Sequence, residues 1–189
     1  VIELGGNDAL RGLAILCVVL CSVTLAGAPV GDSALQYYML HKPAGVLTAT
    51  ADRSQPTVLD LFPPELRRFG LVPAGRLDKD TTGLLLVTDD GDYVHRVITP
   101  KKHVPKVYQV TTKHPVDEAQ VSKLLAGVVL DDDPKPVRAA HCTMVDTHRL
   151  DMTLTEGKYH QVKRMIAAVG NRVEGLQRSR IGGMDLPAD

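Results

Sequence analysis

The sequence predicts an α+β domain built on a mixed, largely antiparallel sheet that is flanked by helices. Two observations lead to this class: the strand candidates come in neighbouring pairs, and few helical patterns lie between them. Apolar residues make up 44% of the 189-residue chain, while Trp is absent and Phe occurs twice, so the core should be mostly aliphatic. This length fits one good-sized domain or two small ones.

The first half of the domain should contain short strands separated by proline and glycine turns. Pro43 and Gly45 favour a turn because proline fixes φ and glycine permits unusual backbone angles. The run Leu84–Val87 has no polar alternation, so both faces of that strand should be buried. The expected elements are strands at 37–40, 46–50, 71–73 and 84–88, short helices at 57–62 and 93–98, and turns at 42–45 and 65–68.

The second half shows clearer periodicity. Residues 106–112 alternate in the manner of a strand, and residues 160–169 carry an apolar stripe at helical spacing that ends before Gly170 and Asn171. A helix at 116–126 should stop at Gly127. The expected elements are strands at 106–112, 138–146 and 149–155, the last two forming an antiparallel pair, and helices at 116–126 and 160–169.

Residues 1–36 differ in composition from the rest, so a boundary is expected between this atypical apolar segment and a domain at 37–189. Residues 13–28 carry no charge and resemble the apolar core of a signal peptide, but Glu3, Asp8 and Pro29 argue against that interpretation. The preferred interpretation is a buried helix and strand. An odd number of cysteines without framework spacing (Cys17, Cys21 and Cys142) is typical of reduced thiols in a cytoplasmic protein.

Charge is balanced in total but not along the chain. The 22 basic and 22 acidic residues cancel, whereas residues 93–113 hold five Lys or Arg and no acid, and residues 156–180 hold six Lys or Arg against two Glu. A neutral protein with two basic segments can still present one basic face to nucleic acid. Charge alone leaves this possibility and a solvated surface without a partner about equal.

One acidic residue, Asp78, stands in an unusual place. It lies in the stretch Gly-Arg-Leu-Asp-Lys-Asp-Thr-Thr-Gly at 75–83, between two apolar strands. A carboxylate beside a buried strand is costly unless it is paired or used chemically. The alternative is a turn cap in which the carboxylate accepts the amides of Thr81 or Thr82.

This stretch resembles the central motif of the pseudouridine synthases, specifically their ribosomal small-subunit (RsuA-like) branch. Three further stretches agree in order and character: Tyr-x-x-Leu-x-Lys-Pro-x-Gly at 37–45, Lys-Val-Tyr-Gln-Val at 106–110, and Glu-Gly-Lys-Tyr-His-Gln-Val-Lys-Arg-Met at 156–165. One Arg-Leu-Asp would be weak, but four ordered motifs over about four fifths of the chain are specific. The resemblance implies a pseudouridine synthase core with an RNA-binding cleft and a C-terminally shortened catalytic domain. It also implies that residues 1–36 are a truncated or incorrect remnant of an N-terminal RNA-binding domain.

The resemblance also implies a mechanism without cofactor or metal. Asp78 would be the catalytic carboxylate that attacks the sugar or assists departure of the uracil, which then rejoins through C5. The base must first be flipped out of its stack. Supporting roles fall to Tyr108, which would stack on the base, Lys163, a cationic partner that keeps Asp78 ionised, Arg76, on the same side of an extended segment as Asp78, and Val173, an aliphatic contact for the base.

The predicted activity is isomerisation of a specific uridine to pseudouridine in ribosomal RNA, 16S rRNA of the small subunit being preferred. The alternatives are 23S rRNA or tRNA as substrate, or a non-catalytic RNA-binding or ribosome-assembly protein. Expected partners are ribosomal RNA or a small-subunit assembly intermediate, with no membrane, and the chain should be a cytoplasmic monomer. The candidate RNA-binding residues are Lys42, Lys101, Lys102, Lys106, Lys158, Arg164, Arg178 and Arg180.

Overall fold

The computed structural model describes residues 15–17, 24–25, 28–29 and 35–186. Two compact units divide the chain, one comprising residues 1–98 with 186–189 and the other residues 99–185. Most of the predicted apolar segment at 1–36 lies outside the described residues. Among the residues that the structure describes, no helix is long and apolar enough to cross a membrane.

The first unit is organised around strand β4 (Tyr37–Lys42) and strand β6 (Thr82–Thr88), which pair antiparallel from Tyr37↔Thr88 to Lys42↔Gly83. Strand β6 is buried on both faces, as its unbroken apolar run predicts. The other elements are β1 (Ile15–Cys17), which pairs with β4, β5 (Val72–Pro73), which pairs with β6, the small β2 (Thr24–Leu25) and β3 (Ala28–Pro29) pair, the 3-10 helix η1 (Val58–Leu61), α1 (Pro64–Arg67) and α2 (Gly91–Ile98).

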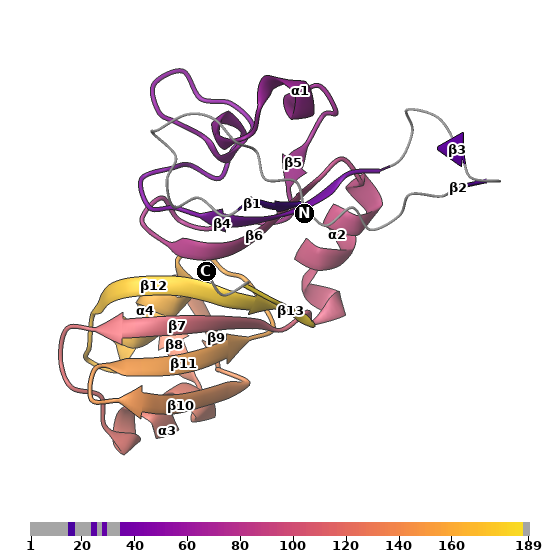
Figure 1. Ribbon diagram of the computed structural model, residues 1–189. Coiled ribbons are helices and arrows are strands. Elements are labelled where there is room, and N and C mark those ends of the chain that lie inside the picture. The colour runs from indigo at the N-terminus through magenta and orange to yellow at the C-terminus, as the bar shows by residue number, and fades with distance from the viewer. Residues whose placement is uncertain (1–14, 18–23, 26–27, 30–34, 187–189) are drawn as a thin grey trace. The chain divides into compact units, whose positions relative to one another are not determined.

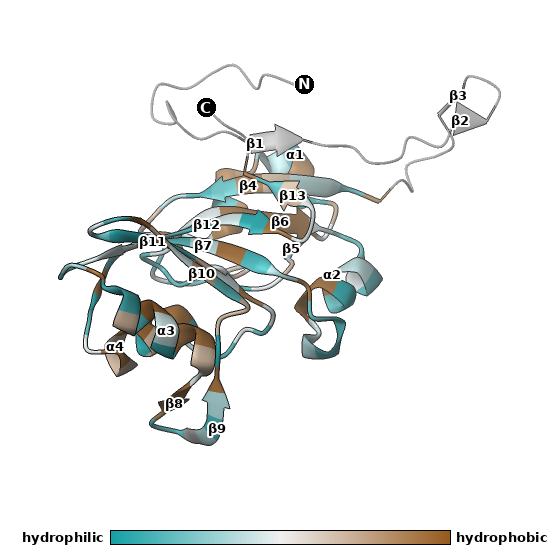
Figure 2. Cartoon of the chain, turned by 90° about the horizontal axis from the view of Figure 1, so that it is seen from below, coloured by the Kyte–Doolittle hydropathy of each residue, from teal (hydrophilic) through white to brown (hydrophobic). Residues whose placement is uncertain are grey.

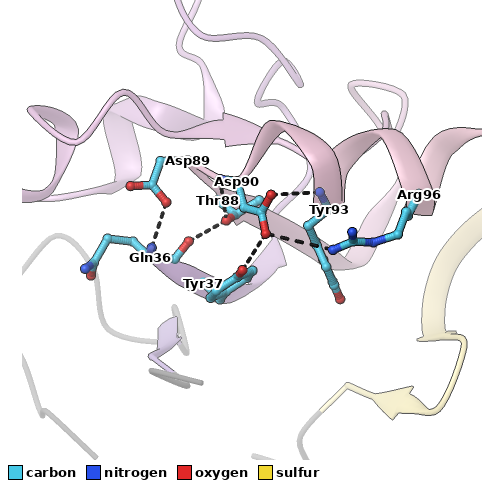
Figure 3. A network of polar contacts seen from close by, with 7 residues as sticks. All are labelled: Gln36, Tyr37, Thr88, Asp89, Asp90, Tyr93 and Arg96. Carbon is cyan, nitrogen blue, oxygen red and sulfur yellow. Dashed lines mark hydrogen bonds and ion pairs between the residues drawn. The ribbon is translucent and has the colours of Figure 1, made fainter. Parts of the chain in front are cut away.

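A hydrogen-bond network anchors the start of α2 to β4 (Figure 3). The Asp90 carboxylate accepts the Tyr37 hydroxyl at 2.5 Å and the Tyr93 amide at 2.9 Å, so it caps the helix and ties it to the strand. The rings of Tyr37 and Tyr93 meet edge to face with 5.3 Å between their centroids. The Thr88 hydroxyl accepts a hydrogen bond from the Asp90 backbone amide at 3.0 Å. Asp90 therefore joins the end of β6, the beginning of β4 and the first turn of α2.

The second unit is a four-stranded antiparallel sheet in the order β12-β7-β11-β10 with two helices on one face (Figures 1 and 2). Its buried face carries Val110, Leu150 and Met152, and helix α4 buries Val162, Met165 and Ile166. The elements are η2 (Pro100–Lys102), β7 (Lys106–Thr112), α3 (Glu118–Ala126), β8 (Val128–Leu130), β9 (Asp133–Val137), β10 (His141–Asp146), β11 (Arg149–Leu154), α4 (Gln161–Ala168), β12 (Val173–Ile181) and β13 (Met184–Asp185).

The predicted α+β class is confirmed by these antiparallel strands and flanking helices. One predicted strand is wrong: at 46–50 only Leu47 pairs, in a single parallel bridge to Thr57, and the next residues bend. The longest strand, β12, was not predicted because its polar residues give no regular alternation. Its pairing with β7 holds it extended despite two register shifts.

Candidate functional site

The segment that carries Asp78 is held by one threonine. The Thr48 hydroxyl donates to the Leu77 carbonyl at 2.7 Å and lies 3.1 Å from the Leu77 amide, which donates back to it. Leu77 is buried, whereas Arg76 is exposed and Asp78 is half-buried. This alternation places Leu77 in the core and leaves the flanking arginine and aspartate toward the surface.

A tight turn follows Asp78. The Thr81 amide donates to the backbone carbonyl of Asp78 at 3.1 Å, which closes the turn through the main chain. The Gly45 amide donates to the Lys79 carbonyl at 2.8 Å, so the loop at 42–45 supports the turn from a distant part of the sequence. Gly45 adopts φ of 86°, a left-handed conformation that suits glycine. The Asp78 backbone is thus fixed on both sides without using its carboxylate in these bonds.

The Lys42 side chain supports this turn from the interior of the protein by hydrogen bonds to backbone carbonyls. Its side chain is fully buried, and its ammonium donates to the carbonyls of Pro43 (2.9 Å), Lys79 (3.2 Å) and Thr81 (2.9 Å). Burial lowers its pKa to about 8, and the carboxylates of Asp80 and Asp78 oppose that shift. The group is therefore still an ammonium at pH 7, and only the ammonium has three hydrogens for three carbonyls.

In the second unit, Tyr108 and Arg178 are opposite each other on β7 and β12. Directly paired residues of antiparallel strands share a face, so both belong to the buried side of the sheet, where Tyr108 is 9% exposed and Arg178 is 2% exposed. Lys106 lies two residues from Tyr108 on the same strand. Burial, and to a smaller extent the Arg178 charge, lowers the pKa of Lys106. Val173 begins β12 and is half-buried.

The segment before α4 is shaped by Gln161, a buried polar side chain. Its side-chain oxygen accepts a hydrogen bond from the Lys158 backbone amide at 2.8 Å, and its side-chain nitrogen donates to the Glu156 carboxylate at 2.9 Å. Lys163 follows in the first turn of α4 and is half-buried. Arg164 donates to the Tyr159 carbonyl at 3.1 Å and forms an ion pair with Asp132.

Comparison with known proteins decides the family. The family model described as RNA pseudouridylate synthase matches residues 36–168. A protein described as the uncharacterized RNA pseudouridine synthase YtzG of Bacillus subtilis is 47% identical over 167 residues, which cover 87% of this chain and 70% of that protein. The chain belongs to the RNA pseudouridine synthase family.

Two further similarities agree with the RsuA-like resemblance and the predicted pseudouridine synthase core. Ribosomal small subunit pseudouridine synthase A of Yersinia pestis is 46% identical over 82% of this chain and 65% of that protein. A solved structure described as a crystal structure of pseudouridylate synthase superposes with a TM-score of 0.77 at 43% identity, over 81% of this chain and 65% of that one. The chain thus spans about two thirds of the length of these relatives.

The structure corrects two of the predicted RNA contacts of this pseudouridine synthase. Lys42 is wrong as a phosphate ligand because its ammonium is enclosed and occupied by three carbonyls. Arg178 is wrong as a surface contact because it is buried in the sheet. Lys42 stands in the first motif and was expected to be structural or phosphate-contacting, whereas Arg178 was marked by its charge. The period of two along β4 places Lys42 in the buried row with Tyr38 and Leu40.

The remaining candidates stay predictions, and their accessibility differs. Lys101, Lys102 and Arg180 are exposed, whereas Lys106, Lys158 and Arg164 are half-buried. Arg180 already binds Asp185 through two hydrogen bonds of 2.5 and 3.0 Å. Sequence reasoning missed Thr48, which no pattern marks. Gln161 is likewise a buried polar side chain, and its place beside the apolar stripe of α4 is a recognisable signal.

Proposed function

We propose that this chain isomerises one specific uridine to pseudouridine in ribosomal RNA, and that the target lies in 16S rRNA of the small subunit. The observation that carries the proposal is the 46% identity to a protein named for that substrate class. The supported Asp78 loop agrees with it, because catalysis requires a carboxylate held in a fixed position before substrate arrives.

The proposed chemistry exchanges one glycosidic bond for another. The bond from the ribose C1′ to uracil N1 breaks, the freed base turns, and a bond forms from C1′ to C5. The proton on C5 is then lost and N1 gains one, so the product is an isomer of the substrate. The Asp78 carboxylate either attacks C1′ or assists departure of the base. Tyr108, Lys163, Arg76 and Val173 are the proposed supporting residues, and a cytoplasmic location is part of the proposal.

Incubation with RNA tests this function directly. The full chain would be mixed separately with 16S rRNA, 23S rRNA and unmodified tRNA transcripts, and also with 16S rRNA partly assembled with small-subunit proteins. Carbodiimide modification followed by reverse transcription maps each pseudouridine as a stop. One new stop is expected, in 16S rRNA, and none with Asp78→Asn.

Other outcomes separate the alternatives. A stop confined to 23S rRNA or tRNA would keep the chemistry and reject the substrate. RNA binding without a stop in any sample would support the non-catalytic RNA-binding alternative.

A further inference from the structure

An exposed aromatic pair precedes helix α4. Tyr159 is 75% exposed, and its ring stacks on His160 with 3.8 Å between ring centroids and 21° between planes. This is the most exposed of the large apolar or aromatic side chains in the described part of the chain. Burial in the core therefore does not explain why a tyrosine lies here.

The backbone under this pair is firmly held. The Tyr159 carbonyl accepts from Arg164 at 3.1 Å, and the His160 carbonyl accepts the Arg164 amide at 3.0 Å. On the other side, the Gln161 side chain accepts a hydrogen bond from the Lys158 backbone amide, and the Gln161 backbone amide donates to the Lys158 carbonyl at 3.2 Å. Tyr159 is thus exposed on an ordered turn, and this reduces the entropy lost when a ligand covers its ring.

His160 occupies an unfavourable backbone region. Its φ is 46°, one of only two positive values for non-glycine residues in the described part of the chain. Such a conformation is unfavourable for a residue other than glycine and persists where surrounding contacts impose it. The imidazole of the same residue lies against one face of the tyrosine ring.

The surroundings of the pair are basic. Lys158 and Lys163 lie within four residues of Tyr159 along the chain, and Glu156, the acidic residue of this segment, is bound to Gln161. Arg164 is also close in the sequence, but its guanidinium is paired with Asp132. A flat aromatic surface next to cationic side chains matches the two chemical parts of a single-stranded nucleic acid, the base and the phosphate. A hydrophobic protein partner would need a broader apolar surface than one ring.

We infer that Tyr159, backed by His160, is a stacking platform for an unpaired base of the RNA substrate. This inference deepens the proposed function and rests on RNA being the ligand. It assigns Tyr159 a positioning role for the strand, separate from the carboxylate chemistry of Asp78. The stack would extend from imidazole to phenol to nucleobase.

Binding of single-stranded RNA tests the platform. The probe is a ten-nucleotide uridine-rich RNA with 2-aminopurine at its centre, titrated with the full chain at several salt concentrations. Stacking of one base contributes about 1–3 kcal/mol, so Tyr159→Ala should weaken binding by about 5- to 150-fold and remove quenching of the 2-aminopurine fluorescence. Tyr159→Phe keeps the ring and should bind within about twofold of wild type.

Two controls separate stacking from charge and from folding. The dependence of log affinity on log salt should keep the same slope in Tyr159→Ala, because no phosphate contact is removed. Duplex RNA of the same composition hides its base faces, so its affinity should not change in this variant. Val129→Ala, at another exposed apolar side chain (58% exposed), should bind both RNAs like wild type.

Several results would overturn the inference. They are absence of single-strand binding by wild type, equal binding by Tyr159→Ala, or an equal loss in Tyr159→Phe, which would assign the effect to the hydroxyl. If pseudouridine forms while Tyr159→Ala binds and reacts normally, the proposed function stands and the platform fails. If no pseudouridine forms but the ring-dependent binding is found, the platform stands and the proposed activity fails.

Discussion

Asp78→Asn should lower single-turnover pseudouridine formation by more than about 1,000-fold while leaving the affinity for RNA within about twofold of wild type. The amide keeps the shape of the carboxylate but cannot act as nucleophile or base. The denaturation midpoint should hardly change, because the backbone around Asp78 is fixed by Thr48 and by the Thr81 amide.

Asp80→Asn is the matched control for this variant. It makes the same change two residues later in the same turn, at an exposed carboxylate, and should retain activity within about threefold. Turnover of Asp78→Asn within tenfold of wild type would remove Asp78 from the chemistry and return it to a structural role in the turn.

Lys42→Met should destabilise the first unit by about 2–4 kcal/mol and reduce turnover with it. Methionine fills a similar volume but leaves the carbonyls of Pro43 and Thr81 without the hydrogen bonds they receive from the ammonium. A buried acceptor that loses its donor costs about 1–3 kcal/mol. The free energy of unfolding is measured by urea titration and compared with single-turnover rates.

Lys79→Met controls for loss of a lysine in the same loop. The Lys79 ammonium donates to Gln55 at the surface, so this variant should change stability by no more than about 0.5 kcal/mol. If Lys42→Met matches it in stability and instead loses RNA affinity, Lys42 is a phosphate contact and not an internal support of the turn.

Periodicity predicted the elements whose own side chains decide their burial. The apolar stripe of α4, the alternation of β7 and the unbroken run of β6 each lead to the observed element. It failed where a distant strand decides the conformation. The polar β12 is held by β7, and residues 46–50 bend where the sequence alternates enough to suggest a strand.

The site residues also divide into those that local sequence marks and those that depend on contacts with distant parts of the chain. The four motifs marked Asp78 and its neighbours because the family spacing is local in the sequence. They could not show that Thr48 grips Leu77 across 29 positions, or that the Lys42 ammonium turns inward to the carbonyls of Lys79 and Thr81. The first motif marked Lys42 as structural or phosphate-contacting, but it could not show that two of the three acceptors come from a turn nearly forty residues away.

The hydrogen bonds by which Asp90 ties α2 to β4 form only within a limited pH range. Hydrogen bonds from the Tyr37 hydroxyl and then from the Tyr93 amide lower the pKa of Asp90 in the folded protein. The contribution of Asp90 to stability is therefore fully present above the pKa of an aspartate in the unfolded chain, and it is lost as pH falls through the lower pKa of the folded state. The same bond raises the pKa of Tyr37 to about 12, so the contribution of Tyr37 is complete below pH 10 and is lost as pH rises through that value. Acid releases the helix by protonating the acceptor, and alkali releases it by removing the donor's proton. Because the second compact unit begins at Thr99, immediately after this helix, α2 is secured to β4 throughout the neutral range at the point where the chain leaves the first unit.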